Sequence, residues 1–211
     1  MSAPAKVAAT PDRRAVRREA TKAEIVAAAW GLVREHGLAG LAMRDLGERV
    51  GMRAQSIYSY FASKHEIYDA MFHEGYVAFM AGTADDEDPA GGSADEARAT
   101  GRRLVHRFFS FCTSDPVRYQ LLFQRTIPDF APSDASYAVA LDAYEAMQRH
   151  LASFGVTDPH AADLWTAVMT GLTDQQISND PGGDRWERVI DRAVDMLLHE
   201  TAPHLFEGST R

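Results

Sequence analysis

Several side chains between residues 44 and 60 have the chemistry needed to contact duplex DNA. Arg53 can donate hydrogen bonds to guanine or to a phosphate, and Gln55 can form two hydrogen bonds with adenine. Arg44 adds a second guanidinium group. These groups suit recognition of a nucleic acid rather than a reaction. The candidates that follow from residue type and position are Arg44, Arg53, Gln55, Ser56 and Tyr60.

Two short helices joined by a glycine turn are expected to hold these side chains. Leu46 and Val50 are four residues apart and therefore share one helix face. Ile57 and Phe61 have the same spacing and supply the buried face of a second helix. Between them, Gly51 can adopt the left-handed backbone that ends a helix. The spacing predicts a helix-turn-helix, whose second helix presents its N-terminal residues to the major groove.

The stretch from Thr21 to Lys64 resembles the DNA-binding segment of the TetR family of transcriptional regulators. The resemblance implies an N-terminal three-helix DNA-binding domain, followed by an all-helical domain that dimerises and usually binds a small effector. The residues that carry it are Thr21, Ile25, Ala28, Ala29, Trp30, Gly37, Leu46, Gly47, Val50, Gly51, Ile57, Tyr58, Tyr60, Phe61, Ser63 and Lys64.

This resemblance adds two residues to the candidate DNA contacts. It implies that Tyr58 packs and contacts the DNA backbone, and that Lys64 neutralises a phosphate. The chain departs from the family at Ala42 and Met43, where threonines usually open the second helix, so a side-chain cap is missing there. Tyr60 stands where a histidine is common, and its hydroxyl can also reach a phosphate.

The second half of the chain has a resemblance of its own. The segments 115–123 and 164–171 resemble the C-terminal domain of those TetR-family members that carry a Trp-His-Gly signature. Trp165 and Gly171 match that signature, whereas Thr170 stands at the histidine position.

The formal net charge of −8 is unevenly distributed along the 211 residues. Residues 1–64 contain 11 Lys/Arg and 6 Asp/Glu, a net charge of +5. Residues 65–211 contain 11 and 24, a net charge of −13. A basic N-terminal part on an acidic body is expected when only one end of a protein meets phosphate. Residues 1–18, rich in Ala, Pro and Arg, are predicted to form a disordered basic arm, from which Arg17 and Arg18 could enter a minor groove.

The composition indicates a globular protein that is expected to be cytoplasmic. No apolar stretch approaches the ~20 residues that span a bilayer, and no apolar segment follows the N-terminal arginines as in a signal peptide. The single cysteine, Cys112, excludes an intramolecular disulfide. It lies in an apolar run, so it is either a buried thiol or a sensor.

Helix-start signals and apolar periodicity predict an all-α fold. Thr21-x-x-Glu24, Ser63-x-x-Glu66 and Ser93-x-x-Glu96 have the pattern of capping boxes. An acidic, Pro- and Gly-rich linker is expected at 83–92. The predicted domains are the arm at 1–18, a DNA-binding domain at 19–66 and a helical effector and dimerisation domain at 67–211. Helices in that last domain are expected near 94–113, 116–124, 133–154, 159–177 and 184–201.

Aromatic, methionine and threonine side chains of the second domain could form either a filled core or a cavity for an apolar effector. The candidates for such a pocket are Phe108, Phe111, Phe123, Tyr144, Met147, Trp165, Met169 and Thr170. The last two helices are apolar on more than one face, which suggests a self-complementary dimer interface. Its candidate residues are Leu164, Val168, Leu172, Val189, Ile190, Ala193 and Leu197.

Catalysis has no support in the sequence. It contains no Gly-Lys dipeptide for a phosphate-binding loop and no Gly-x-Ser-x-Gly elbow. His199 and His204 are five apart with Pro203 between them, so they do not form a helical zinc motif. No metal or cofactor is expected.

The predicted function is a dimeric, ligand-responsive regulator, a repressor that binds an inverted-repeat DNA operator and is released by a small apolar effector, with no membrane partner. Two alternatives stay open. One is an activator or architectural DNA-binding protein that has no effector. The presence or absence of a cavity in the second domain distinguishes it from the ligand-responsive regulator. The other is a helical binding protein that no longer engages DNA, which Ala42 and Met43 leave open.

Overall fold

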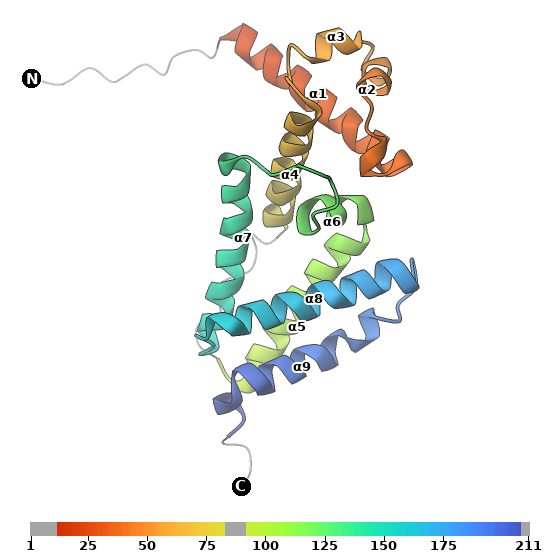
Figure 1. Ribbon diagram of the computed structural model, residues 1–211. Coiled ribbons are helices and arrows are strands. Elements are labelled where there is room, and N and C mark those ends of the chain that lie inside the picture. The colour runs from red at the N-terminus through yellow and green to blue at the C-terminus, as the bar shows by residue number, and fades with distance from the viewer. Residues whose placement is uncertain (1–11, 83–91, 208–211) are drawn as a thin grey trace, which may run out of the picture. The chain divides into compact units, whose positions relative to one another are not determined.

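The computed structural model describes residues 12–82 and 92–207, and every regular element in those ranges is helical (Figure 1). The predicted all-α fold is therefore confirmed. The chain divides into two compact units, 1–71 and 72–211, so the division falls inside a helix, whereas the sequence placed it after residue 66. In the described residues, no helix is long and apolar enough to span a membrane.

The first unit is built from three helices and the beginning of a fourth. These are α1 (Arg13–His36), α2 (Met43–Arg49), α3 (Ala54–Ile57) and the start of α4 (Lys64–Ala81), with a 3-10 turn at Leu38–Gly40. Their apolar faces meet in a small core, because the i, i+4 stripe of each helix is turned inward. Ile25, Ala29, Leu46, Ile57 and Ile67 are completely buried there.

Helix α1 begins earlier than predicted, and this corrects the expected arm. Residues 13–18 are helical, whereas residues 1–11 lie outside the described residues. Asp12 caps the helix by accepting a hydrogen bond from the Arg14 amide at 3.0 Å. Thr21 is therefore not a cap: its hydroxyl donates to the Arg17 carbonyl within the helix. The predicted capping box at Thr21 was wrong.

The described residues of the second unit form five further helices. They are α5 (Ala94–Thr113), α6 (Pro116–Phe123), α7 (Asp134–Ser153), α8 (Pro159–Asn179) and α9 (Ile190–Thr201), with 3-10 turns at Glu187–Val189 and Pro203–Leu205. Ser93 and Glu96 form the full capping box predicted for α5. Asp115 and Asp158 cap α6 and α8 ahead of a proline. The helix expected at 184–201 begins only at Ile190, because residues 187–189 form a 3-10 turn. The linker expected at 83–92 lies outside the described residues except for Gly92.

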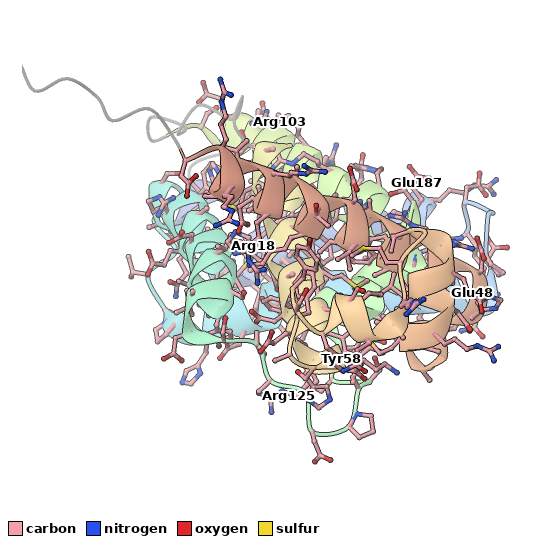
Figure 2. The ribbon with its side chains drawn as sticks, turned by 90° about the horizontal axis from the view of Figure 1, so that it is seen from above. Arg18, Glu48, Tyr58, Arg103, Arg125 and Glu187 are labelled. Carbon is pink, nitrogen blue, oxygen red and sulfur yellow. The ribbon has the colours of Figure 1, made fainter. Side chains whose placement is uncertain are left out.

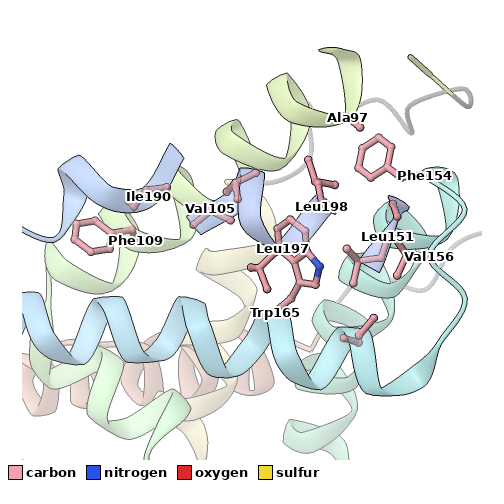
Figure 3. Packing of buried hydrophobic residues seen from close by; sticks show 14 residues of the cluster. Ala97, Val105, Phe109, Leu151, Phe154, Val156, Trp165, Ile190, Leu197 and Leu198 are labelled. Carbon is pink, nitrogen blue, oxygen red and sulfur yellow. The ribbon is translucent and has the colours of Figure 1, made fainter. Parts of the chain in front are cut away.

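Helices α5, α8 and α9 pack against one another around the main core of this unit. Figure 3 shows Trp165 of α8 among Leu197 and Leu198 of α9, with Val105 and Phe109 on α5. Gly101 allows the close approach of α5 and α9, since a Cβ there would lie 3.0 Å from a methyl of Val194. Arg102 of α5 also pairs with Asp195 of α9 at 2.7 Å.

Two residues assigned to the dimer interface belong instead to this core. Ile190 and Leu197 are 0% and 2% exposed within one subunit, so neither can contact a second copy. The periodicity of α9 correctly indicates two apolar faces but cannot tell which of them faces the core. Exposed apolar side chains in this part of the unit are Leu164 on α8, Val189 in the 3-10 turn before α9 and Met196 on α9, which are 41%, 37% and 59% exposed.

Candidate nucleic-acid interface and internal cavity

The α2–α3 pair has the tight turn that the sequence predicted. Gly51 has a φ of +66°, in the left-handed region. Gly47 is buried where the helices meet, and a Cβ on it would lie 2.7 Å from the carbonyl oxygen of Met52. The Met52 amide in turn donates to the Gly47 carbonyl at 2.8 Å. Only glycine at 47 therefore allows the two helices to cross at this separation.

Helix α3 is a single turn that continues into a looser turn. The amides of Tyr60 and Phe61 donate to the Ile57 carbonyl at 2.8 and 3.0 Å, which brings Phe61 into the core. Arg53, Gln55 and Tyr58 are consequently exposed, and Ser56 and Tyr60 are half-buried. Figure 2 labels Tyr58 in the segment that follows α3. The structure thus brings five of the seven predicted DNA-contact residues together in this one segment.

Arg44 lies at the start of α2 and is well exposed. Its guanidinium is 3.4 Å from the carboxylate of Asp45 and 3.7 Å from that of Glu48. Exposed pairs of this kind are weak, about 0–1 kcal/mol, so a phosphate can replace them.

Lys64 is the first residue of α4, where the helix dipole disfavours a cation. Its ammonium donates to the Ala39 carbonyl at 3.4 Å and lies 5.4 Å from the centre of the Tyr68 ring. Partial burial lowers the pKa of Lys64. The side chain is therefore held against the 3-10 turn rather than fully extended into solvent.

Arg18 is a residue of this site that sequence reasoning assigned only to a flexible arm. Its guanidinium donates to the Ser59 carbonyl at 2.7 Å and lies 5.0 Å from the centre of the Tyr60 ring. Arg18 and Ser59 are 41 residues apart in the chain, so no local pattern indicates the contact.

The second unit contains a partly open cavity of about 530 Å³, within the range of about 300–1,000 Å³ typical of small-molecule sites. Seven of the eight predicted pocket residues line it: Phe108, Phe123, Tyr144, Met147, Trp165, Met169 and Thr170. Phe111 does not line it, and its assignment to the pocket was wrong. Its ring packs against Phe79, with the Arg118 guanidinium 3.8 Å from its centre.

The polar groups of the cavity wall differ in what they offer a ligand. The hydroxyls of Thr166 and Thr170 donate to carbonyls of their own helix, at 2.9 and 2.8 Å. The Tyr144 hydroxyl donates to Asp163 at 3.4 Å. The ionisable basic side chains that line the cavity are Arg107, Arg149 and His150.

Comparison with known proteins adds to this geometry. The sequence model of the tetR family of bacterial regulatory proteins matches residues 25–71, which include the α2–α3 pair. The HTH-type transcriptional regulator Rv1816 of Mycobacterium tuberculosis is 28% identical over 127 residues, covering 58% of this chain and 52% of that protein. This chain belongs to the TetR family of transcriptional regulators. It spans about half the length of the curated relatives it matches.

Solved structures show that the TetR-like fold extends over most of the chain. The regulatory protein SCO4313 is 20% identical, with a TM-score of 0.67 over 90% of this chain and 99% of its own. FadR of Bacillus subtilis, solved with stearoyl-CoA, is 14% identical, with a TM-score of 0.62 over 83% and 96% of the two chains.

Two features of this TetR-family chain follow from its own residues. Helix α2 opens at Ala42 with no side-chain hydrogen bond to its first turn, as the missing threonines predicted. Cys112 is completely buried, and burial raises the pKa of its thiol, so the protonated and unreactive form is favoured. The buried-thiol interpretation of Cys112 therefore holds over that of a sensor.

Proposed function

We propose that this TetR-family regulator is a repressor that binds an inverted-repeat operator as a dimer and is released by a small apolar effector. The observation that carries the proposal is helix α4, which contributes to both functional parts. It starts at Lys64 beside the helix-turn-helix, and its last two turns supply Tyr76, Phe79 and Met80 to the cavity wall. A ligand in the cavity therefore contacts the same helix that begins in the DNA-binding unit.

In the bound complex, base recognition is assigned to Arg53 and Gln55, whose exposed groups match guanine and adenine edges. Phosphate contacts are assigned to Arg44, Ser56, Tyr58, Tyr60 and Lys64. The DNA-binding domain is assigned to residues 19–66, with Arg18 supporting it, and the effector and dimerisation domain to residues 67–211.

Dimerisation is assigned to the outward face of α8 and α9. Leu164, Val189 and Met196 are exposed apolar side chains on this face, and Gly171 leaves open space beside α8. Val168, Leu172 and Ala193 complete the assigned interface; all three are half-buried, and Val168 and Leu172 also pack against the main core. A two-fold arrangement of such a face would bury the same residues from both copies and place two DNA-binding domains on one operator.

The cavity favours a ligand-responsive regulator over an effector-independent one. An effector that prefers the conformation unable to bind DNA lowers the affinity for operator DNA by some factor. By linkage, operator DNA lowers the affinity for the effector by the same factor. Among proteins of similar fold, FadR was solved with stearoyl-CoA, and a TetR variant of Acinetobacter baumannii AYE was solved with minocycline. Different ligands in such proteins support a small-molecule role for the cavity here.

Titration of the full chain with duplex DNA over a range of salt concentrations tests the DNA-binding part. The affinity of the wild type should fall steeply with salt concentration. Lys64→Ala should flatten the slope of log affinity against log salt concentration by about one unit for all DNA sequences. Lys22→Ala removes the same charge from α1 and serves as the matched control, with a smaller expected effect. Failure of the wild type to bind duplex DNA at low salt would overturn the proposal.

A further inference from the structure

We infer that the ligand of the cavity is an organic anion, with an apolar body and one negatively charged group. The inference rests on the proposed function of the cavity as an effector site, and it names the chemical class of that effector. It is carried by the charges of the cavity wall, which are opposite in sign to those of the domain around it.

The wall of the cavity is basic although its domain is strongly acidic. Residues 65–211 contain 24 Asp/Glu and only 11 Lys/Arg. Among the described residues, the side chains that line the cavity nevertheless include Arg107, Arg149 and His150 and no aspartate or glutamate. A surface drawn at random from this domain would carry more carboxylates than cations. The reversed sign indicates that the cavity is suited to a negative group.

Helix spacing places these basic groups along the edges of two apolar stripes. On α5, Arg107 follows Leu104 by three residues, and both line the cavity. On α7, Arg149 and His150 follow Ala146 by three and four residues, and all three line it. Residues three and four apart share a helix face. Each cation therefore stands beside apolar residues of the cavity wall.

The partial burial of Arg107 strengthens its interaction with an anion. Burial lowers the pKa of its guanidinium, because the charge lies away from bulk water. A carboxylate brought to such a group is attracted more strongly than it would be at an exposed arginine, since screening by water is weaker.

A neutral polar ligand is matched less well by the same wall. The Thr166 and Thr170 hydroxyls are engaged with their own helix backbone, and that of Tyr144 donates to Asp163. The apolar body of the ligand would contact the rings of Phe108 and Trp165 and the side chain of Met169. Its charged end would point toward the edge that carries Arg107 and Arg149.

Isothermal titration calorimetry of the full-length protein with three probes of equal alkyl length tests the inference. The probes are dodecanoate, dodecan-1-ol and dodecylammonium, each kept below its micelle concentration. Dodecanoate should bind roughly tenfold or more tightly than the alcohol, as a charge-assisted hydrogen bond predicts, and the ammonium should bind most weakly. Equal or weaker binding of dodecanoate relative to the alcohol would overturn the inference, as would absence of binding by all three.

Paired variants identify the groups responsible. Arg107→Gln with Arg149→Gln should remove most of the preference for dodecanoate while leaving the affinity for the alcohol nearly unchanged. The control is Arg103→Gln with Arg192→Gln, which removes the same charge from exposed positions of α5 and α9 outside the cavity wall; Figure 2 shows Arg103 at the surface. An unchanged preference in the cavity variant, or an equal loss in the control, contradicts the inference.

Binding of duplex DNA by the ligand-free proteins separates this inference from the proposed function. Wild type and cavity variant should bind DNA alike, because the substitutions lie outside residues 19–66. Absence of the anion preference in a wild type that binds DNA removes only the inference about ligand class. Absence of DNA binding by the wild type removes the proposed regulator whatever the probes show.

Discussion

Arg18 donates a hydrogen bond from its guanidinium to the carbonyl oxygen of Ser59 at 2.7 Å, and so ties the first turns of α1 to the segment after α3. The same guanidinium lies 5.0 Å from the centre of the Tyr60 ring. Tyr58 belongs to this segment, and Gln55 and Ser56 lie in α3 directly before it, so the conformation of the segment influences how all three are presented. Arg18 therefore acts as a positioning residue for the candidate DNA interface.

Arg18→Gln should loosen that segment and weaken DNA binding. The contact between a cation and an exposed aromatic ring contributes about 0.5–1 kcal/mol, so a loss of operator affinity of roughly two- to fivefold is expected. Arg14→Gln removes the same charge from the same end of α1 and should cost less. Fluorescence anisotropy with labelled duplex measures both. Equal effects of the two variants would show that charge alone matters.

Ala42→Thr should stabilise the protein by adding the missing cap of α2. A threonine hydroxyl at this position can accept a hydrogen bond from the first turn, a contribution of about 0.5–2 kcal/mol. Ala42→Val, which has the same shape without the hydroxyl, is the matched control and should not raise the free energy of unfolding. Urea denaturation followed by circular dichroism distinguishes the two, and an equal gain for valine would rule out capping as the cause.

The parts of the site that were predictable from sequence are those set by neighbours in the chain. Gly51, Ile57 and Phe61 are positioned by local helix and turn geometry, so their spacing predicted them. Arg18 was missed because its partner is 41 residues away and its own surroundings contain no apolar stripe.

Side chains that depend on long-range packing could not be assigned in the same way. Leu197 was misassigned because a doubly apolar helix has two possible partners. Phe108 and Phe111 lie in the same apolar run and both contact the Phe79 ring, yet only Phe108 lines the cavity. Their spacing in the chain carries no information about which of them faces the open space.

Alkaline pH should weaken the first unit through Tyr68. Its buried hydroxyl donates to the Leu38 carbonyl, and burial raises its pKa to about 12. The neutral form is favoured in the folded state, so this stability is present below pH 10, the ordinary value, and is lost as the pH rises toward about 12.

Comparison of Tyr68→Phe with the wild type checks this sign. The variant should be less stable by about 1 kcal/mol at neutral pH, because the carbonyl of Leu38 loses the buried Tyr68 donor and keeps the Leu41 amide. That difference in stability should shrink in alkali, because Tyr68 ionises in the unfolded wild type and this ionisation favours its unfolding. Tyr58→Phe, at an exposed position, is the control. A gap that stays constant between neutral and alkaline pH would contradict the assignment.

Met196→Asp should dissociate the proposed dimer without unfolding the subunit. Met196 is 59% exposed on the outer face of α9, so an aspartate there meets solvent in the monomer but a like charge in a two-fold interface. Leu141→Asp, at an exposed position of α7, should leave the dimer intact. Sedimentation velocity at micromolar concentration measures both. Leu197→Asp, by contrast, should unfold the protein because that residue is buried.

Selection of binding sites from a pool of random duplexes tests the central claim most directly, since the claim is that the exposed segment from Arg53 to Tyr60 reads base sequence as a two-fold pair. The wild type should enrich an inverted repeat. Gln55→Ala should enrich the same repeat with the preference relaxed at one base pair in each half-site, a loss of about 1–3 kcal/mol of discrimination. Enrichment of no sequence by the wild type, or an identical consensus from both proteins, would contradict that claim.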